Sequence, residues 1–318
     1  MGPTLEIKGV SLKPICRSIL SVPGHVQKMH AKALNSSADN VMLDLEDSVP
    51  VDKKKDARKQ VIETLLSGSW RAKTVSVRCN GLDTPFAYGD LIDIVAAAGQ
   101  ILDSVVIPKV NHPGDIHFVQ RLLDGVESDL QPDANIGIEA SIESAQGLEN
   151  VSAIAGASGR LVSLVFGIAD YSASIGARLV SVSGHGEAEA EIYPGHRWHY
   201  PMSRIIMAAR AHNLQAIDAP YGNFKDAEGL RKAATMTNAL GFDGKWAIHP
   251  DQIEIVNEVF SPTVAEIERA QAVMAAHQTA VEKGRGAVSL DGRMVDQATI
   301  RMAEQLCAQA KRLGLLTP

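Results

Sequence analysis

The chain is poor in cysteine and contains no long apolar run, and both absences narrow its class. Its cysteines lie far apart, with no CxxC pair among Cys16, Cys79 and Cys307. This spacing fits a reducing compartment and argues against a disulfide framework or a zinc site. No stretch of about 18 consecutive apolar residues occurs, and the opening residues lack the apolar core of a signal peptide. We therefore expect a cytoplasmic protein that has no membrane partner.

Charge and short motifs exclude further classes. The formal net charge is −6 at pH 7, so the chain lacks the basic stripe that nucleic acid or an anionic membrane requires. No GxGxxG follows the first expected strand, and neither a P-loop nor a GxSxG motif occurs. Nucleic-acid, dinucleotide, nucleoside triphosphate and serine-hydrolase functions thus lose their usual support. The 318 residues suffice for one large α/β domain with an appendage.

Short apolar stretches alternate with helical stretches over residues 15–261. The eight expected strands cover residues 15–22, 40–47, 74–80, 104–110, 135–143, 161–170, 215–220 and 244–250. An open doubly wound sheet more often stops at about five or six strands. The count therefore predicts an α/β fold of the (β/α)8 TIM-barrel type.

The alternation stops after residue 261. A long helix is expected from residue 262, then a hairpin around Asp291 and Gly292, then a terminal helix from Asp296. A segment of this size buries little apolar surface alone. We expect a catalytic barrel at residues 1–261 and a C-terminal extension at residues 262–318, which packs on the barrel or on a neighbouring subunit.

Two acids end successive strands of the predicted barrel. Glu143 ends the first strand, Asp170 ends the second, and one helical segment separates them. Strands joined in this way are parallel neighbours, so both carboxylates lie at the same edge of the sheet. Sites in α/β folds form at the carboxyl ends of strands, where paired carboxylates suit a hard divalent cation. A helix N-cap explains either acid alone equally well, but the two together favour a metal.

Other charged residues are expected at the same mouth. They are Arg17 or its neighbours, Glu46, Asp47, Arg78, Lys109, Asp218 and His249. Acids and bases interleaved at one mouth suit joint binding of a metal and an anionic substrate. Arg78 has two interpretations, an ion pair with Glu46 or Asp47 and a donor to a developing oxyanion. For Lys109 a structural ion pair is as good an explanation, and His249 is either a helix cap or a wall of the site.

Residues 171–200 show no clean period and predict a long loop of the kind that forms lids or binding loops. The loop is rich in acidic residues and histidines, namely His185, Glu187, Glu189, Glu191, His196 and His199. They lack HExxH or tetrahedral spacing, so a solvated lid is the better interpretation. Tyr171, Trp198 and Tyr200 either shape an acyl pocket or pack, and packing is favoured slightly.

Eight sequence blocks, spread over nearly the whole chain, resemble a known family. They are RSILSVPG (17–24), DLEDSV (44–49), SVRCNGLDTPF (76–86), IPKV (107–110), IESAQG (142–147), FGIADYSAS (166–174), GKWAIHPDQI (244–253) and GRGAVSLDGRMVDQATIRMAE (284–304). In their order and coverage they resemble the citrate lyase β-subunit-like group of the HpcH/HpaI aldolase superfamily, and within it the malyl-CoA lyases.

The resemblance implies roles for the residues at the strand ends. Glu143 and Asp170 would be the protein ligands of Mg²⁺, with Mn²⁺ as the alternative ion. Arg78 would hold the substrate and its enolate oxygen, while Asp296 would be an acid/base residue that reaches an adjacent subunit. Backbone N–H groups of Ala169 and Asp170 would receive the carboxylate of a 2-oxo acid. Two further acids near the metal's water ligands would be Glu46 and Asp47.

The resemblance also implies a coenzyme A channel and an oligomer. The channel would be lined by Arg17, Lys32, Lys245, Trp246, Ile248, His249 and Pro250. The protein would form a homotrimer or a homohexamer, in which the C-terminal extension packs on a neighbouring subunit.

The implied activity is the reversible cleavage of a CoA ester. Malyl-CoA, β-methylmalyl-CoA or citramalyl-CoA would give acetyl-CoA or propionyl-CoA and a 2-oxo acid such as glyoxylate. The stretch 172–200 departs from the family's pattern, so the oxo acid stays open. Three alternatives remain: a malyl-CoA thioesterase, a citrate lyase β subunit, and a catalytically silent barrel that binds CoA.

Overall fold

The structure is a computed structural model that describes residues 15–130, 135–178, 196–282, 288–290 and 292–316. The chain divides into two compact units, Met1–Val256 and Asn257–Pro318. The sequence placed this boundary a few residues later, after residue 261. Among the described helices, none has the length and apolar character needed to cross a membrane.

The first unit contains a closed barrel of eight parallel strands. They are β1 (Ser18–Pro23), β2 (Asn40–Asp44), β3 (Thr74–Arg78), β4 (Ser104–Ile107), β5 (Gly137–Ile142), β6 (Leu161–Phe166), β7 (Gln215–Asp218) and β8 (Gly244–Ala247). Each strand pairs with the next in chain order, and β8 pairs with β1 to close the barrel. The (β/α)8 TIM-barrel prediction is therefore confirmed.

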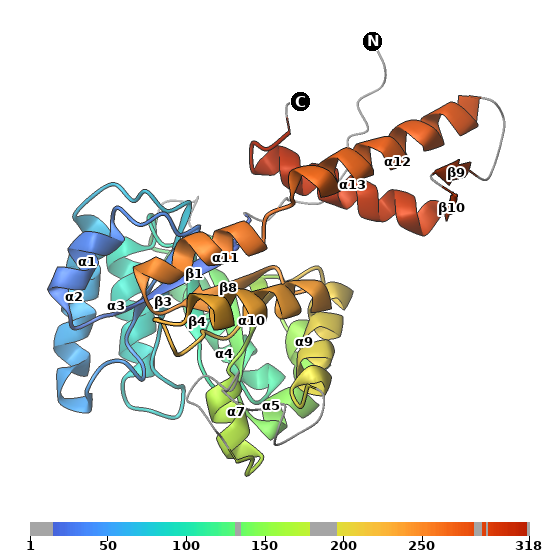
Figure 1. Ribbon diagram of the computed structural model, residues 1–318. Helices are drawn as coiled ribbons and strands as arrows, with labels where there is room; N and C mark the ends of the chain where they lie inside the picture. The colour runs from blue at the N-terminus through green and yellow to red at the C-terminus, as the bar shows by residue number, and fades with distance from the viewer. Residues whose placement is uncertain (1–14, 131–134, 179–195, 283–287, 291, 317–318) are drawn as a thin grey trace. The chain divides into compact units, whose positions relative to one another are not determined.

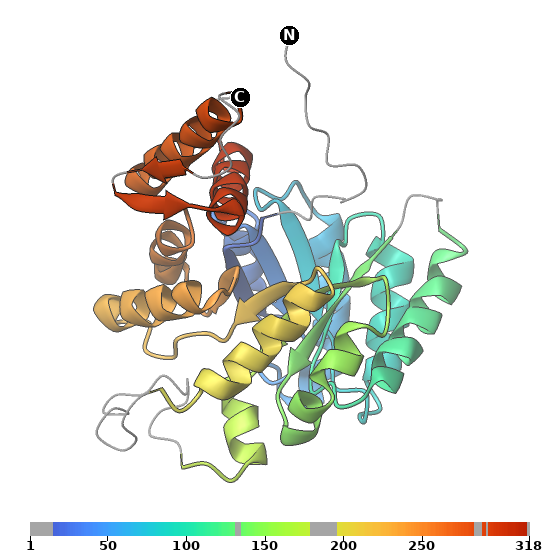
Figure 2. The same ribbon diagram turned by 90° about the vertical axis from the view of Figure 1, so that its right-hand side faces the viewer.

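Helices lie outside the barrel wall, and those that precede β8 connect its strands (Figures 1 and 2). They are α1 (Gln27–Ala33), α2 (Lys54–Leu66), α3 (Ala87–Ala98), α4 (Pro113–Glu127), α5 (Ala145–Glu149), α6 (Val151–Ala155), α7 (Ile168–Ser174), α9 (His199–Ala211), α10 (Ala227–Leu240) and α11 (Ile253–Val259), with the short turns η1 (Val51–Lys53) and η2 (Pro250–Gln252). In α4 the buried residues Ile116, Val119 and Leu123 recur every three to four positions, which gives the helix one apolar face. That face is what holds an outer helix on the barrel.

The ends of α10 show how local sequence sets helix boundaries. Asp226 caps the helix, because its side chain accepts a hydrogen bond from the Gly229 N–H. At the other end Gly241 has φ +112°, a left-handed conformation that favours glycine and ends the helix. Asp226 thus marks where the loop after β7 gives way to α10.

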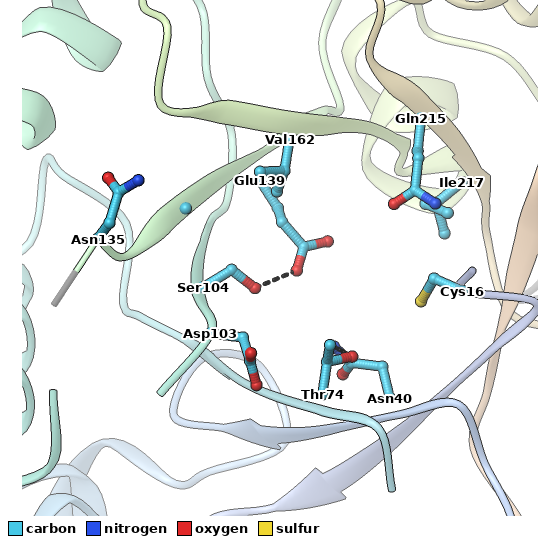
Figure 3. A pocket seen from close by; sticks show the side chains of 11 residues that line it. Cys16, Asn40, Thr74, Asp103, Ser104, Asn135, Glu139, Val162, Gln215 and Ile217 are labelled. Atoms are coloured by element: carbon cyan, nitrogen blue, oxygen red, sulfur yellow. Dashed lines mark hydrogen bonds between the residues drawn. The ribbon is translucent and has the colours of Figure 1, made fainter. Parts of the chain in front are cut away.

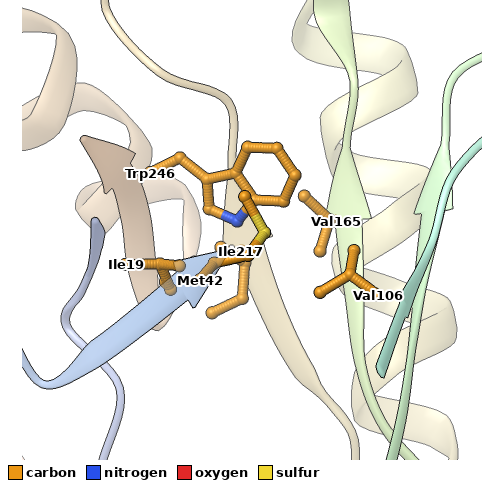
Figure 4. Packing of buried hydrophobic residues seen from close by; sticks show 6 residues of the cluster. All are labelled: Ile19, Met42, Val106, Val165, Ile217 and Trp246. Atoms are coloured by element: carbon orange, nitrogen blue, oxygen red, sulfur yellow. The ribbon is translucent and has the colours of Figure 1, made fainter. Parts of the chain in front are cut away.

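The middle of the barrel is apolar and its two ends are polar. Six inward residues from different strands pack together: Ile19, Met42, Val106, Val165, Ile217 and Trp246 (Figure 4). On β5, residues Glu139 and Ser141 alternate toward the same side as Glu143, which directly follows the strand. The apolar layer therefore separates Glu139, at the amino end, from Glu143, at the carboxyl end.

The amino end of the barrel holds a small polar cavity of about 170 Å³ (Figure 3). Glu139 reaches into it and accepts hydrogen bonds from Ser104 Oγ at 2.6 Å and Ser163 Oγ at 2.8 Å. Burial raises the pKa of Glu139, although both hydroxyl groups oppose that shift. This cavity lies at the opposite end from the predicted site.

The second unit contains two helices and a hairpin, which are α12 (Val264–Glu282), β9 (Val288–Leu290), β10 (Arg293–Val295) and α13 (Gln297–Arg312). Strands β9 and β10 pair antiparallel, and Gly292 between them has φ +73°. Buried Ala270 and Val273 of α12 pack with Ile300 and Ala303 of α13. The helices and hairpin match the sequence prediction, and the docking of this extension stays a prediction.

The stretch predicted as a loop from 171 to 200 is helical at both ends. Helix α7 continues to Ser174, and α9 begins at His199. Trp198 is buried against Tyr171, whose ring lies 6.2 Å from it in an edge-on arrangement. Tertiary packing thus extends helices into a segment without a clear period, and these two aromatic residues pack as favoured. Tyr200 is exposed, and the acidic stretch with His185, Glu187, Glu189 and Glu191 lies outside the described residues.

Candidate active site

A cavity of about 260 Å³ opens at the carboxyl ends of the strands. Its lining includes seven of the residues that the sequence predicted for the site: Asp47, Arg78, Glu143, Ala169, Asp170, Trp246 and Ile248. The barrel therefore gathers residues that are far apart in the sequence, because parallel strands present their carboxyl ends together.

Glu143 is the buried acid of this cavity. Only 4% of the residue is exposed, and its Oε2 atom has no hydrogen-bond partner among the residues that the structure describes. Burial, opposed by the Arg78 guanidinium and reinforced by the Glu46 and Asp170 carboxylates, raises the pKa of Glu143 to about 8. An ionised carboxylate here needs a cation as a partner.

Gly167 makes room for Glu143. A Cβ atom at position 167 would lie 2.7 Å from Glu143 Cδ, closer than any real side chain sits. The residue follows β6 directly and precedes α7. Sequence reasoning missed this glycine, and the signal for it was its position between an apolar strand and the predicted ligand Asp170.

Asp170 lies in the first turn of α7 and is half-buried. The described residues contain no group of three or more His, Cys, Asp or Glu side chains arranged to hold a metal ion. Mg²⁺ commonly takes one or two protein carboxylates and completes its octahedron with water and substrate oxygens. The unpartnered Oε2 of Glu143, the space left by Gly167 and the neighbouring Asp170 carboxylate therefore fit a hard divalent ion.

Arg78 ends β3 and is held by two acids from the β2 side. Its Nε and Nη2 atoms donate to Asp44 Oδ1 and Oδ2 at 2.6 and 2.7 Å, and Nη1 lies 3.0 Å from Glu46 Oε2. Its guanidinium also lies 5.4 Å from the centre of the Trp246 ring. Burial alone would lower the pKa of Arg78, but Asp44 and then Glu46 and Glu143 raise it, so the group keeps its charge.

Asp44 is a site residue that the sequence analysis did not select. It is fully buried, and its carboxylate also accepts the backbone N–H groups of Glu46 and Ser48. The parallel register pairs Asp44 with Arg78, so an acid and an arginine at the ends of neighbouring strands were the available signal. The predicted ion pair of Arg78 with Glu46 is present, whereas no ion pair with Asp47 is found in the described structure.

The loop after β2 is fixed by two lysines. Lys109 Nζ donates to Glu46 Oε1 at 2.6 Å and lies 3.7 Å from Asp47. Its φ of 53° is left-handed, which is uncommon for a residue other than glycine. Buried Lys54, also missed by sequence reasoning, donates to the carbonyl oxygens of Leu45 and Glu46 at 2.7 and 2.6 Å. Glu46 is thus held on both its backbone and its side chain.

A groove of about 580 Å³ adjoins the cavity. It brings together four of the residues predicted for the coenzyme A channel: Lys32, Ile248, His249 and Pro250. Ile248 and Ser21 line the groove and the cavity alike. His249 caps η2 by accepting the Asp251 N–H, and its ring stacks on Phe224 at 4.9 Å, so it serves both as a cap and as a wall.

The structure contradicts the predicted positions of Arg17 and Lys245. Arg17 precedes β1, so it lies at the amino end of the barrel, where its Nε donates to Asp39 Oδ2 at 2.7 Å. Lys245 is fully buried, and its Nζ donates to Asp218 Oδ2 at 2.5 Å rather than facing a channel. Strand alternation turns its neighbour Trp246 into the barrel, where it lines the cavity and not the groove.

Asp296 begins the last helix of the second unit. It is exposed and caps α13, accepting hydrogen bonds from Thr299 N and Thr299 Oγ1, both at 2.8 Å. These bonds lower the pKa of Asp296. This lowering describes the single chain, in which Asp296 is exposed.

Buried acids, a fixed arginine and an adjoining groove at the carboxyl ends of a (β/α)8 barrel define an enzyme active site. A model of the HpcH/HpaI aldolase/citrate lyase family matches residues 17–250. The chain belongs to this family, which confirms the resemblance seen in the sequence.

Individual relatives cover nearly all of the chain. An L-malyl-CoA/β-methylmalyl-CoA lyase of Cereibacter sphaeroides is 39% identical over 92% of this chain and 93% of its own length. A malyl-CoA/β-methylmalyl-CoA/citramalyl-CoA lyase of Chloroflexus aurantiacus is 35% identical over 100% and 94%. The crystal structure of CitE from Mycobacterium tuberculosis with magnesium, acetoacetate and coenzyme A matches with a TM-score of 0.75 and 26% identity, over 94% of this chain and 100% of that chain.

Proposed function

We propose that the protein is a Mg²⁺-dependent CoA-ester lyase. It cleaves malyl-CoA to acetyl-CoA and glyoxylate and catalyses the reverse condensation, with β-methylmalyl-CoA and citramalyl-CoA as the alternative substrates. The observation that carries the proposal is the buried Glu143 carboxylate, which has an unpartnered Oε2 and lies in one cavity with Asp170 and Arg78. The names of the two lyase relatives support the class of substrate.

Glu143 and Asp170 are the proposed metal ligands, and Mg²⁺ is preferred over Mn²⁺. When bound there, the ion acts as a Lewis acid that polarises the oxo group of the acid. Gly167 keeps the Glu143 carboxylate in place, and the backbone N–H groups of Ala169 and Asp170 at the start of α7 face the acid's carboxylate in this proposal. The magnesium in the related CitE structure supports this choice of ion.

Arg78 is the proposed donor to the enolate oxygen of acetyl-CoA. Its guanidinium is held by Asp44 and Glu46 before any substrate arrives. A charge fixed in advance stabilises a developing oxyanion without reorganisation during the reaction. Glu46 and Asp47 are proposed to orient water near the metal ligands.

The groove of about 580 Å³ is the proposed site of coenzyme A. Lys32 supplies positive charge for the phosphates, while Ile248, His249 and Pro250 form one wall. Because Ile248 also lines the cavity, a thioester lying in the groove has a direct path to Arg78.

Asp296 is the proposed acid/base residue, acting on the site of an adjacent subunit. This role requires a homotrimer or a homohexamer, in which the C-terminal extension, residues 262–318, packs on a neighbour. The three cysteines are free, which supports the cytoplasm as the compartment.

The test mixes the purified protein with acetyl-CoA, Mg²⁺ and either glyoxylate or pyruvate, and follows the CoA species by mass spectrometry. We expect a malyl-CoA or citramalyl-CoA product that disappears with EDTA. Isolated malyl-CoA is the second substrate, because a lyase converts it to acetyl-CoA and glyoxylate. A thioesterase would instead give free CoA and malate, and the proposal would then be wrong.

A further inference from the structure

The cavity with Glu143 and the groove with Lys32 meet at Ile248 in the segment after β8, and the loop after β7 lines the cavity. The loop after β7 contributes Ala219, Pro220 and Gly222 to the cavity. The segment after β8 contributes Ile248, which lines both spaces. The relative position of these loops therefore sets how the two spaces meet.

Gln252 links the two loops through its side-chain amide. Its Nε2 donates to Tyr221 O at 2.8 Å, while its Oε1 accepts the N–H groups of Ile248 at 2.8 Å and His249 at 3.2 Å. Only 1% of the residue is exposed, so water does not compete for these bonds. One buried amide thus satisfies three backbone groups of the two loops.

A second buried contact lies at the ends of the two strands from which these loops start. Lys245 Nζ donates to Asp218 Oδ2 and to Ala219 O at 2.7 Å, and Asp218 Oδ1 accepts the Ala219 N–H at 2.9 Å. This contact holds the end of β7 to β8. Gln252 acts farther out, on the loop residues next to the open spaces, so it is the contact that decides their alignment.

We propose that Gln252 is a positioning residue that aligns the groove with the cavity. The inference rests on the proposed function, because a lyase must hold the thioester carbon and the oxo acid within reacting distance. The charged groups proposed to bind the two ligands take no part in the three bonds of Gln252, so each ligand keeps them when Gln252 is lost. Their mutual alignment changes, however, and a displacement of about 1 Å costs about 100-fold in rate. Gln252 thus governs kcat rather than the binding of either ligand alone.

Two substitutions distinguish the bonds that the Gln252 amide accepts from the bond that it donates. Gln252→Glu retains an oxygen for Ile248 and His249 but places a second oxygen against Tyr221 O. Gln252→Ala removes all three bonds. The control is Thr237→Val, a buried change in α10, where the Thr237 hydroxyl donates to Ala234 O of the same helix.

Hydrogen exchange followed by mass spectrometry tests whether Gln252 links the loops after β7 and β8. Gln252→Ala should speed exchange at Ile248 and His249 and in residues 219–226, whereas Gln252→Glu should speed it only in residues 219–226. Thr237→Val should leave both segments unchanged. Unaltered exchange in both segments of Gln252→Ala would overturn the inference, whatever the enzyme's activity.

Steady-state kinetics and calorimetry measure the effect of the Gln252 variants on kcat and on ligand binding. Both Gln252 variants should lose about 10- to 100-fold in kcat, while the Kd of free CoA, and of glyoxylate or pyruvate with Mg²⁺, stays near the wild-type value. A normal kcat, or a Kd that weakens as much as kcat falls, would contradict the positioning role. A wild-type protein without turnover of any CoA ester would refute the proposed function, and the exchange data alone would then decide whether Gln252 links the loops.

Discussion

Asp44 and Arg78 form a bidentate ion pair across neighbouring strands, with Oδ1–Nε and Oδ2–Nη2 distances of 2.6 and 2.7 Å. The pair is buried, and the pKa of Asp44 is lowered because Arg78 outweighs the effect of burial. Arg78 lines the cavity, so buried Asp44 is the residue that orients the proposed enolate donor.

Asp44→Asn should therefore lower kcat by about 100-fold and destabilise the fold by about 3 kcal/mol, since the buried Arg78 charge loses its partner. Steady-state kinetics and urea unfolding measure the two effects. Asp39→Asn is the matched control, because Asp39 holds Arg17 in the same bidentate manner at the other end of the barrel. Equal losses of kcat in both variants would show that only stability is involved.

Gly167→Ala should weaken Mg²⁺ binding about tenfold or more, since the new methyl group displaces the Glu143 carboxylate. Titration calorimetry with Mg²⁺ and pyruvate measures the change. Gly159→Ala is the control, because a Cβ at position 159 meets no atom within 4 Å. Unchanged Mg²⁺ affinity in Gly167→Ala would mean that Glu143 is not a ligand.

Glu143→Ala and Asp170→Ala should each abolish turnover and the dependence of activity on Mg²⁺. Assays across a Mg²⁺ titration, with EDTA as the reference, measure this. Glu139→Gln is the matched control, because Glu139 is a buried acid of the same strand that lies at the amino end. Near-normal activity in either alanine variant would show that the substituted residue is not a metal ligand.

The fold was predictable because each strand is a short, mainly apolar stretch that alternates with a helical one and is followed by charged or turn residues. Glu143, Asp170 and Arg78 were predictable for the same reason, since a residue at the end of a parallel strand has a known place in a barrel. Residues 171–174 were not, because packing of Tyr171 against Phe166 and Trp198 extends α7 in the absence of a period.

The errors in the predicted site concern residues whose place depends on side-chain direction or on strand bounds and register. Lys245 and Trp246 are adjacent in the sequence but point to opposite sides of β8, and the sequence does not say which side faces the barrel interior. Arg17 was misplaced because the first strand begins at Ser18, one residue after it. Asp44 was passed over because its partner lies 34 residues away and is adjacent only through the strand register.

Glu139 should make the stability of the barrel depend on pH. Its pKa in the folded state is raised above the ordinary value of 4.5, so the folded state binds its proton more tightly than the unfolded state. Its contribution is fully present below about pH 4.5 and is lost as pH rises through the folded-state pKa. Urea unfolding from pH 4 to 8 should show a smaller fall in stability for Glu139→Gln than for wild type. Identical slopes would contradict this assignment.

Asp296 has a structural role and a proposed chemical role, and the choice of substitution separates them. Its carboxylate caps α13 through Thr299, so Asp296→Ala removes the cap and the base together. Asp296→Asn keeps a good N-cap but cannot accept a proton. We expect Asp296→Asn to retain the thermal stability and CoA affinity of the wild type and to stop deuterium exchange from D2O into the methyl group of acetyl-CoA. Thr299→Val, which loses only the hydroxyl bond to the cap, is the control and should continue to exchange. Persistent exchange in Asp296→Asn would mean that another residue generates the enolate, and the case for an active site completed by a neighbouring subunit would lose its chemical basis.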